Sequence, residues 1–157
     1  MINPNALIIG EALVDIVVPQ RGESKEIPGG SPANVALTLG RLDRNARLLT
    51  WLGSDARGQL VRKHLEESNV VVSQESMRAE KTSTALAKLD ETGAATYTCD
   101  IEWKLPECEI GDNTVVVHSG SIAATLEPGG SDVVQLLERA REVATVTYDP
   151  NARPTIM

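Results

Sequence analysis

Short aliphatic runs alternate with amphipathic stretches along nearly the whole chain. Apolar residues that recur every three or four positions predict helices over 32–42, over about 55–67 with Asp55 as the cap, and after Gly129-Gly130-Ser131 up to Ala140. Runs of β-branched and aliphatic residues predict strands over 6–18 with a break near Gly10, and over 47–52, 70–73, 84–89, 94–99, 114–118 and 143–148. Helices between buried strands imply right-handed crossovers, so the pattern predicts an α/β fold with a parallel sheet.

Two segments interrupt this alternation. Pro19–Pro28 is polar and turn-prone, which predicts a loop. Thr84–Leu89 and Ala94–Cys99 flank a glycine-containing connection, which predicts a β-hairpin over the 84–100 region that projects from the main sheet as a lid. A two-stranded ribbon is marginal by itself because its edges stay unpaired, so we expect the lid to pair with that of a second chain in a homodimer.

Composition excludes several classes of protein. The 157 residues include 15 Lys and Arg against 22 Asp and Glu, a net charge of −7, which argues against a nucleic-acid binder. Two Trp, two Tyr and no Phe are too few rings for a stacking platform. The N-terminus does not resemble a signal peptide, no apolar run approaches the roughly 20 residues that span a membrane, and two cysteines make no disulfide framework. We therefore expect a cytoplasmic protein with two free thiols and no membrane partner.

The strongest local pattern is a pair of glycines before a predicted helix. Gly29-Gly30 precedes Ser31-Pro32, where Ser31 is the expected N-cap and Pro32 the first helical residue. Two glycines allow a ligand to approach the backbone, and the helix start offers N–H donors. Asn34, one turn into the helix, carries the donor and acceptor that suit sugar hydroxyls. The alternative is a tight turn before an ordinary capped helix.

Other polar residues in apolar surroundings are candidates for a site. Asp15 lies inside an apolar strand, where a buried carboxylate needs partners. Ligand hydroxyls are one solution and neighbouring backbone N–H groups are the alternative. His64 on a helix face is expected to be structural, whereas His118 at a strand end is a further candidate. The sequence contains no P-loop, no Gly-x-Gly-x-x-Gly and no Gly-x-Ser-x-Gly, which argues against three common nucleotide-binding and hydrolase classes.

Together and in order, these segments resemble the PfkB carbohydrate kinase family, which includes ribokinase and fructokinase. The resemblance rests on Gly10-Glu11 with Asp15, the Gly-Gly-Ser-Pro-Ala-Asn-Val-Ala block at 29–36, Gly-Ser-Asp-Ala-Arg-Gly at 53–58, the hairpin, and Asp-Pro-Asn-Ala-Arg at 149–153. Asp43 stands where the first family signature usually has Gly or Ser. The 149–153 block is most similar to the fructokinase branch.

The resemblance implies a ribokinase-like α/β fold with a small β lid that in many members pairs with another subunit. It implies transfer of the ATP γ-phosphoryl group, with Mg²⁺, to a hydroxyl of a small sugar. Asp15, Gly29, Gly30 and Asn34 match the family's sugar-binding positions. Asn151 and Arg153 match residues near the substrate and the transferred phosphate.

The late Gly-Ala-Gly-Asp block, which supplies the anion hole and catalytic base in this family, is absent. Residues 1–157 are therefore expected to form the N-terminal part of a kinase domain whose C-terminal half is missing. The base is expected beyond Met157, with no catalytic or metal-binding residue in this chain and no activity from it alone. The alternatives are a non-catalytic sugar-binding or scaffold protein of the same fold, and a nucleoside kinase. Few aromatic rings argue against a purine pocket.

Overall fold

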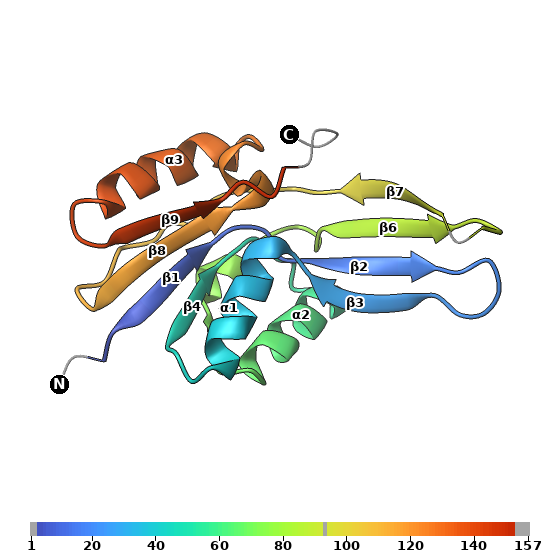
Figure 1. Cartoon of the computed structure of the whole chain (residues 1–157), viewed down its shortest axis with the longest axis horizontal. Helices are drawn as coiled ribbons and strands as arrows, with labels where there is room; N and C mark the ends of the chain where they lie inside the picture. Colours follow the sequence, from blue (N-terminus) through green and yellow to red (C-terminus); the bar gives the residue numbers. More distant parts are fainter. Residues whose placement is uncertain (1–2, 93, 153–157) are drawn as a thin grey trace.

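The computed structural model describes residues 3–92 and 94–152, which form two sheets joined end to end (Figure 1). The larger sheet has five parallel strands in the order β5-β4-β1-β8-β9. They are β1 (Asn5–Ile9), β4 (Ala46–Leu49), β5 (Val70–Val72), β8 (Thr114–Gly120) and β9 (Thr145–Asp149). The parallel sheet predicted from the alternating pattern is confirmed.

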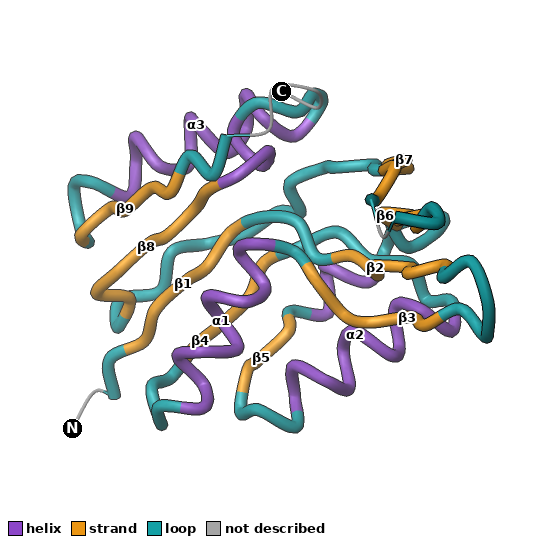
Figure 2. Tube along the Cα trace, turned by 45° about the vertical axis from the view of Figure 1, so that its right-hand side comes forward, coloured by secondary structure: helices purple, strands orange, loops and turns teal. Residues whose placement is uncertain are grey.

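Helices cover both faces of the parallel sheet (Figure 2). On one face lie α1 (Ser31–Arg41) and α2 (Ala56–Glu66), and on the other lies α3 (Gly129–Ala140). Short 3-10 helices span η1 (Gln74–Met77) and η2 (Ser121–Ala124). Side chains alternate along β1, so Ile8 packs in the core beneath α1 and α2, whereas Leu7 and Ile9 pack in the core beneath α3. The three predicted helices are confirmed.

The smaller sheet has four strands in the order β3-β2-β6-β7, and we call it the lid sheet. Its strands are β2 (Leu13–Val18), β3 (Lys25–Gly29), β6 (Thr84–Leu89) and β7 (Ala95–Asp100). It extends to the right of the parallel sheet in Figure 1. The β6–β7 hairpin is confirmed, with antiparallel register from Thr84–Asp100 to Leu89–Ala95. It is half of a larger sheet, however, because β2 runs parallel to β6 and antiparallel to β3.

Two local predictions are wrong. Lys25–Gly29 is a strand and not part of a loop, because its backbone pairs with β2. Ser31 is not the N-cap of α1, because Gly30 occupies that position and no side chain caps the helix. Within 3–92 and 94–152, the helices are all too short or too polar to span a bilayer.

Candidate functional site

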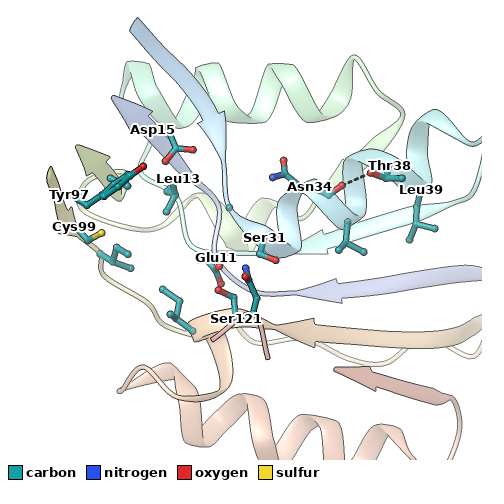
Figure 3. A pocket seen from close by; sticks show the side chains of 16 residues that line it. Glu11, Leu13, Asp15, Ser31, Asn34, Thr38, Leu39, Tyr97, Cys99 and Ser121 are labelled. Atoms are coloured by element: carbon teal, nitrogen blue, oxygen red, sulfur yellow. Dashed lines mark hydrogen bonds between the residues drawn. The ribbon is translucent and has the colours of Figure 1, made fainter. Parts of the chain in front are cut away.

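A cavity of about 1250 Å³ lies at the junction of the two sheets (Figure 3). In the strand order β5-β4-β1-β8-β9, the chain builds outward from β1 in one direction and from β8 in the other. Neighbouring crossovers diverge at such a point and leave a crevice at the carboxyl ends of the strands. Glu11 follows β1, Ser121 follows β8, and both line the cavity. The cavity therefore occupies the usual ligand position of an open α/β sheet.

Part of the cavity lining is polar. Five of its side chains form no hydrogen bond or ion pair with another described residue: Asp15, Ser31, Asn34, Ser121 and Asn151. In Figure 3, Asp15 projects from β2 while Ser31 and Asn34 project from the first turn of α1. The N–H groups of a first helical turn also lack intrahelical partners. Donors and acceptors from separate elements thus converge on one space without partners among residues 3–92 and 94–152.

Apolar side chains lie among these polar groups in the lining. They include Leu13, which lies beside Asp15 in Figure 3, and also Ala85, Ile101 and Ile122, together with the ring of Tyr97 and the thiol of Cys99. Tyr97 is 71% exposed and is the only aromatic residue lining the cavity among those that the structure describes. A molecule that carries both hydroxyl groups and C–H groups fits this mixed lining.

The glycine pair brings three segments together at the base of the cavity. Gly30 has φ of 109°, in the left-handed region, and a Cβ there would collide with the backbone oxygen of Glu11 and lie 3.0 Å from the Cα of Ala12. At Gly29 a Cβ would collide with the Asp15 carboxylate. The pair therefore allows the start of α1 to approach the β1–β2 connection, and it leaves room for Asp15.

Two carboxylates face this region in different surroundings. Asp15 is half-buried, and burial raises the pKa of its carboxyl above the ordinary value. Glu11 is only 5% exposed. Each carboxylate is a hydrogen-bond acceptor when it is ionised.

The structure brings four of the six predicted site residues to the cavity wall: Asp15, Gly30, Asn34 and Asn151. Gly29 lies beneath Asp15 without lining the cavity. Arg153 lies outside the described residues. Direct sugar contacts by these residues stay a prediction.

The histidines lie outside the cavity. His118 Nδ1 is 2.9 Å from Thr147 Oγ1, and burial lowers its pKa although Asp149 opposes that shift. His64 lies on α2, away from the cavity. Both Cys99 and Cys108 are free thiols. Among the described residues no cluster of His, Cys, Asp and Glu could hold a metal ion.

Sequence reasoning missed Glu11 and Ser121 as site candidates. Each follows the carboxyl end of a central strand, and those strands are neighbours at the divergence point of the sheet. Ser121 is also in the left-handed region, with φ of 54°. Such strain in a non-glycine residue is common at functional sites. The signal was thus the strand order, which the sequence pattern leaves open.

Comparisons with known proteins agree with this geometry. The family model described as "pfkB family carbohydrate kinase" matches residues 3–157. A fructokinase of Salmonella typhimurium is 32% identical over 165 residues, covering 98% of this chain and 53% of the relative. The chain spans about half the length of the curated relatives it matches.

Solved structures show the same fold. A fructokinase of Halothermothrix orenii superposes with a TM-score of 0.85 at 24% identity, over 97% of this chain and 59% of that one. A fructokinase of Vibrio cholerae O395 solved with fructose, ADP and calcium ion superposes with a TM-score of 0.78 at 26% identity, over 98% and 53%. The expected ribokinase-like α/β fold with a β lid is confirmed. Since the family model matches nearly the full length of this chain, the chain belongs to the pfkB family of carbohydrate kinases.

Proposed function

We propose that this chain is the sugar-binding half of an ATP-dependent kinase that phosphorylates a hydroxyl of a small sugar, of the fructokinase kind. The observation that carries the proposal is the set of five polar side chains that converge on the cavity without hydrogen-bond or ion-pair partners among the described residues. The resemblance of the chain to fructokinases supports the choice of sugar. Two free cysteines, one of them exposed, are consistent with action in the reducing cytoplasm.

In this proposal the polar and the apolar residues of the lining recognise different parts of the sugar. Asp15 binds a hydroxyl group from β2, and Asn34 binds one from the first turn of α1. Asn151 contacts the sugar from the segment after β9. Leu13 and Ile101 contact the C–H face of the ring. Several oriented hydrogen bonds fix which hydroxyl is presented for phosphorylation, and positioning of this kind is a major part of phosphoryl-transfer catalysis.

The described residues do not fit ATP and Mg²⁺ as they fit a sugar. They include no metal-binding cluster, and the sequence has no glycine-rich phosphate loop of the P-loop type. We propose that the nucleotide and Mg²⁺ are held mainly by the second half of the kinase, which also supplies the catalytic base. The residues of this chain bind and orient the acceptor sugar.

The proposal predicts sugar binding without turnover. Titration of fructose into the purified 157-residue chain, followed by calorimetry, is expected to give saturable binding that exceeds that of adenosine. ATP-dependent phosphorylation of fructose or ribose is expected to be undetectable with this chain. It is expected to appear when the chain continues through a Gly-Ala-Gly-Asp block.

Other results of these experiments would indicate one of the alternative functions. Sugar binding with no phosphorylation from the longer chain indicates a non-catalytic sugar-binding protein. Tighter binding of adenosine than of any sugar indicates a nucleoside kinase. Phosphorylation by the 157-residue chain that is lost in Asp15→Ala contradicts the division of labour between the two halves.

We also propose that the protein forms a homodimer through the lid sheet. Its outer strands β3 and β7 have no partner beyond them in the described sheet, and Ile27 on β3 is 49% exposed. Open strand edges and exposed apolar residues favour association with a second copy. Ile27→Lys is expected to shift the molar mass measured by light scattering from dimer to monomer.

The matched control is Leu42→Lys, because Leu42 is 63% exposed at the end of α1, outside the lid sheet. That variant is expected to remain dimeric. A wild-type monomer at all concentrations contradicts the dimer without affecting the proposed sugar site.

A further inference from the structure

A joint outside the lining of the sugar cavity connects the lid sheet to the parallel-sheet body. Thr82 and Ser83 immediately precede β6, and each is only 4% exposed. Asp55, the N-cap of α2, accepts hydrogen bonds from Thr82 N at 2.9 Å and from Thr82 Oγ1 at 2.6 Å. The same carboxylate accepts the capping bond from Gly58 N at 2.8 Å. One exposed aspartate thus holds both a helix start and the entry to a lid strand.

The Thr82 hydroxyl links a further part of the body to this joint. Its Oγ1 accepts a hydrogen bond from Gly53 N at 3.1 Å while it donates to Asp55. A Cβ on Gly53 would lie 2.9 Å from Thr82 N, so only glycine allows the two segments this close. The packing and the hydrogen bonds therefore hold Thr82 in one place relative to the β4–α2 connection.

Ser83 links the Thr82 joint to β2, the strand that carries Asp15. The backbone oxygen of Ser83 accepts a hydrogen bond from Val14 N at 3.0 Å, and Val14 is the residue before Asp15. Two residues later, Ala85 pairs in register with Asp15. The Ser83 hydroxyl also bonds the backbone of Glu102, which ties the return segment of the hairpin to the same point.

An ion pair between α2 and the lid sheet is a weaker link than these hydrogen bonds. Arg57 contacts Glu26 on β3, but the two side chains are 41% and 38% exposed. Solvent-exposed pairs contribute little to placement. Hydrogen bonds to buried Thr82 are the more effective link, because a buried polar group left without its partner is costly.

We propose that Asp55 and Thr82 form the joint that fixes the lid sheet relative to the body and so positions Asp15 over the sugar cavity. Both are positioning residues, since neither lines the cavity. The inference rests on the proposed sugar-binding function. It assigns a role in substrate affinity to the Gly-Ser-Asp-Ala-Arg-Gly segment at 53–58, which the cavity itself leaves unexplained.

The test separates the joint from the helix cap. Asp55→Ser keeps a good N-cap for Gly58 but is too short to hold Thr82 as well. Thr82→Val keeps the side-chain shape and removes the hydroxyl, whereas the control Thr82→Ser keeps the hydroxyl. Fructose affinity by calorimetry and amide hydrogen exchange are measured for the 157-residue chain and all three variants, at a temperature where each is folded.

Asp55→Ser and Thr82→Val are each expected to weaken fructose binding about fivefold or more, the lower end of the effect of an unsatisfied buried polar group. Amide exchange is expected to accelerate in β2 and β6 but not in β1, β4 or β8. The double variant is expected to be little worse than either single variant, because both remove the same interaction. Thr82→Ser is expected to behave as the wild type.

Unchanged fructose affinity in both variants overturns the proposal. Amide exchange that accelerates equally in both sheets also overturns it. Either result means that Asp55 acts only as the N-cap of α2. If the wild type binds no sugar, the proposed function fails separately. The exchange data then test by themselves whether Asp55 and Thr82 hold the lid sheet in place. Acceleration confined to β2 and β6 supports that role, and uniform acceleration overturns it.

Discussion

Asp15→Ala is expected to weaken sugar binding roughly 10- to 150-fold, because a hydrogen bond to a charged group contributes about 1.5–3 kcal/mol. The Asp15 carboxylate faces the cavity and forms no hydrogen bond or ion pair with any residue in the described part of the chain. The sugar is therefore its expected partner, and the substitution removes the acceptor for the sugar hydroxyls without breaking a hydrogen bond or ion pair to a described residue. Calorimetric titration with fructose measures the effect.

The matched control is Asp100→Ala. Asp100 lies on β7 of the same sheet, where it pairs with Lys81 and does not line the cavity. Its replacement is expected to leave the sugar affinity within about twofold, because exposed ion pairs contribute little. Equal affinities for Asp15→Ala and the wild type would remove Asp15 from the site.

The same carboxylate predicts the pH dependence of binding. Burial raises the pKa of Asp15, so its ionised form is lost at a higher pH than for an ordinary aspartate as the pH falls. Sugar affinity that depends on the carboxylate is expected to fall over that acidic range. Asp15→Asn, which cannot ionise, is expected to bind weakly at neutral pH and to lose this dependence.

The sequence predicts the parallel sheet well because its signals are local. Each central strand is a short apolar run, and each intervening helix has an apolar face, so element type and order follow from the pattern. Strand order does not follow from it. That β1 lies between β4 and β8 is set by packing between distant segments, and for this reason Glu11 and Ser121 were not placed together.

The lid sheet illustrates a second limit of sequence patterns. Its strand β3 contains Ile27 as its only large apolar residue and also contains Pro28, so it has the composition of a loop. Proline is tolerated because β3 lies at the edge of the sheet, where one side of the backbone needs no partner. The parallel pairing of β2 with β6 joins segments about seventy positions apart, and no local pattern signals such a pairing.

The glycine pair shows that a tertiary contact can override a local sequence preference. The sequence favoured Ser31 as the N-cap, because serine is a common capping residue. The structure uses Gly30 instead, since the chain must take a positive φ there and pass close to the backbone of Glu11. A requirement of the tertiary contact thus overrides the local preference.

Gly30→Val is expected to abolish most of the sugar affinity while the parallel sheet remains folded. A β-branched residue at φ of 109° is strained by about 1–3 kcal/mol. Its Cβ would also collide with the backbone oxygen of Glu11. Relief of that collision displaces the β1–β2 connection, which carries Glu11 into the cavity and leads to the strand of Asp15. Calorimetry with fructose measures the loss, and circular dichroism with thermal unfolding verifies the fold.

Gly22→Val is the matched control, because it introduces the backbone strain of Gly30→Val without the steric collision. Gly22 has a similar φ of 101°, but a Cβ there would meet no atom within 4 Å, and it lies in the β2–β3 connection outside the cavity. Both variants therefore carry comparable strain, and only Gly30→Val also forces two segments apart. We expect similar modest losses of thermal stability from strain and a loss of sugar affinity only in Gly30→Val. Equal sugar affinities in the two variants would mean that Gly29-Gly30 is a turn and not part of the sugar site.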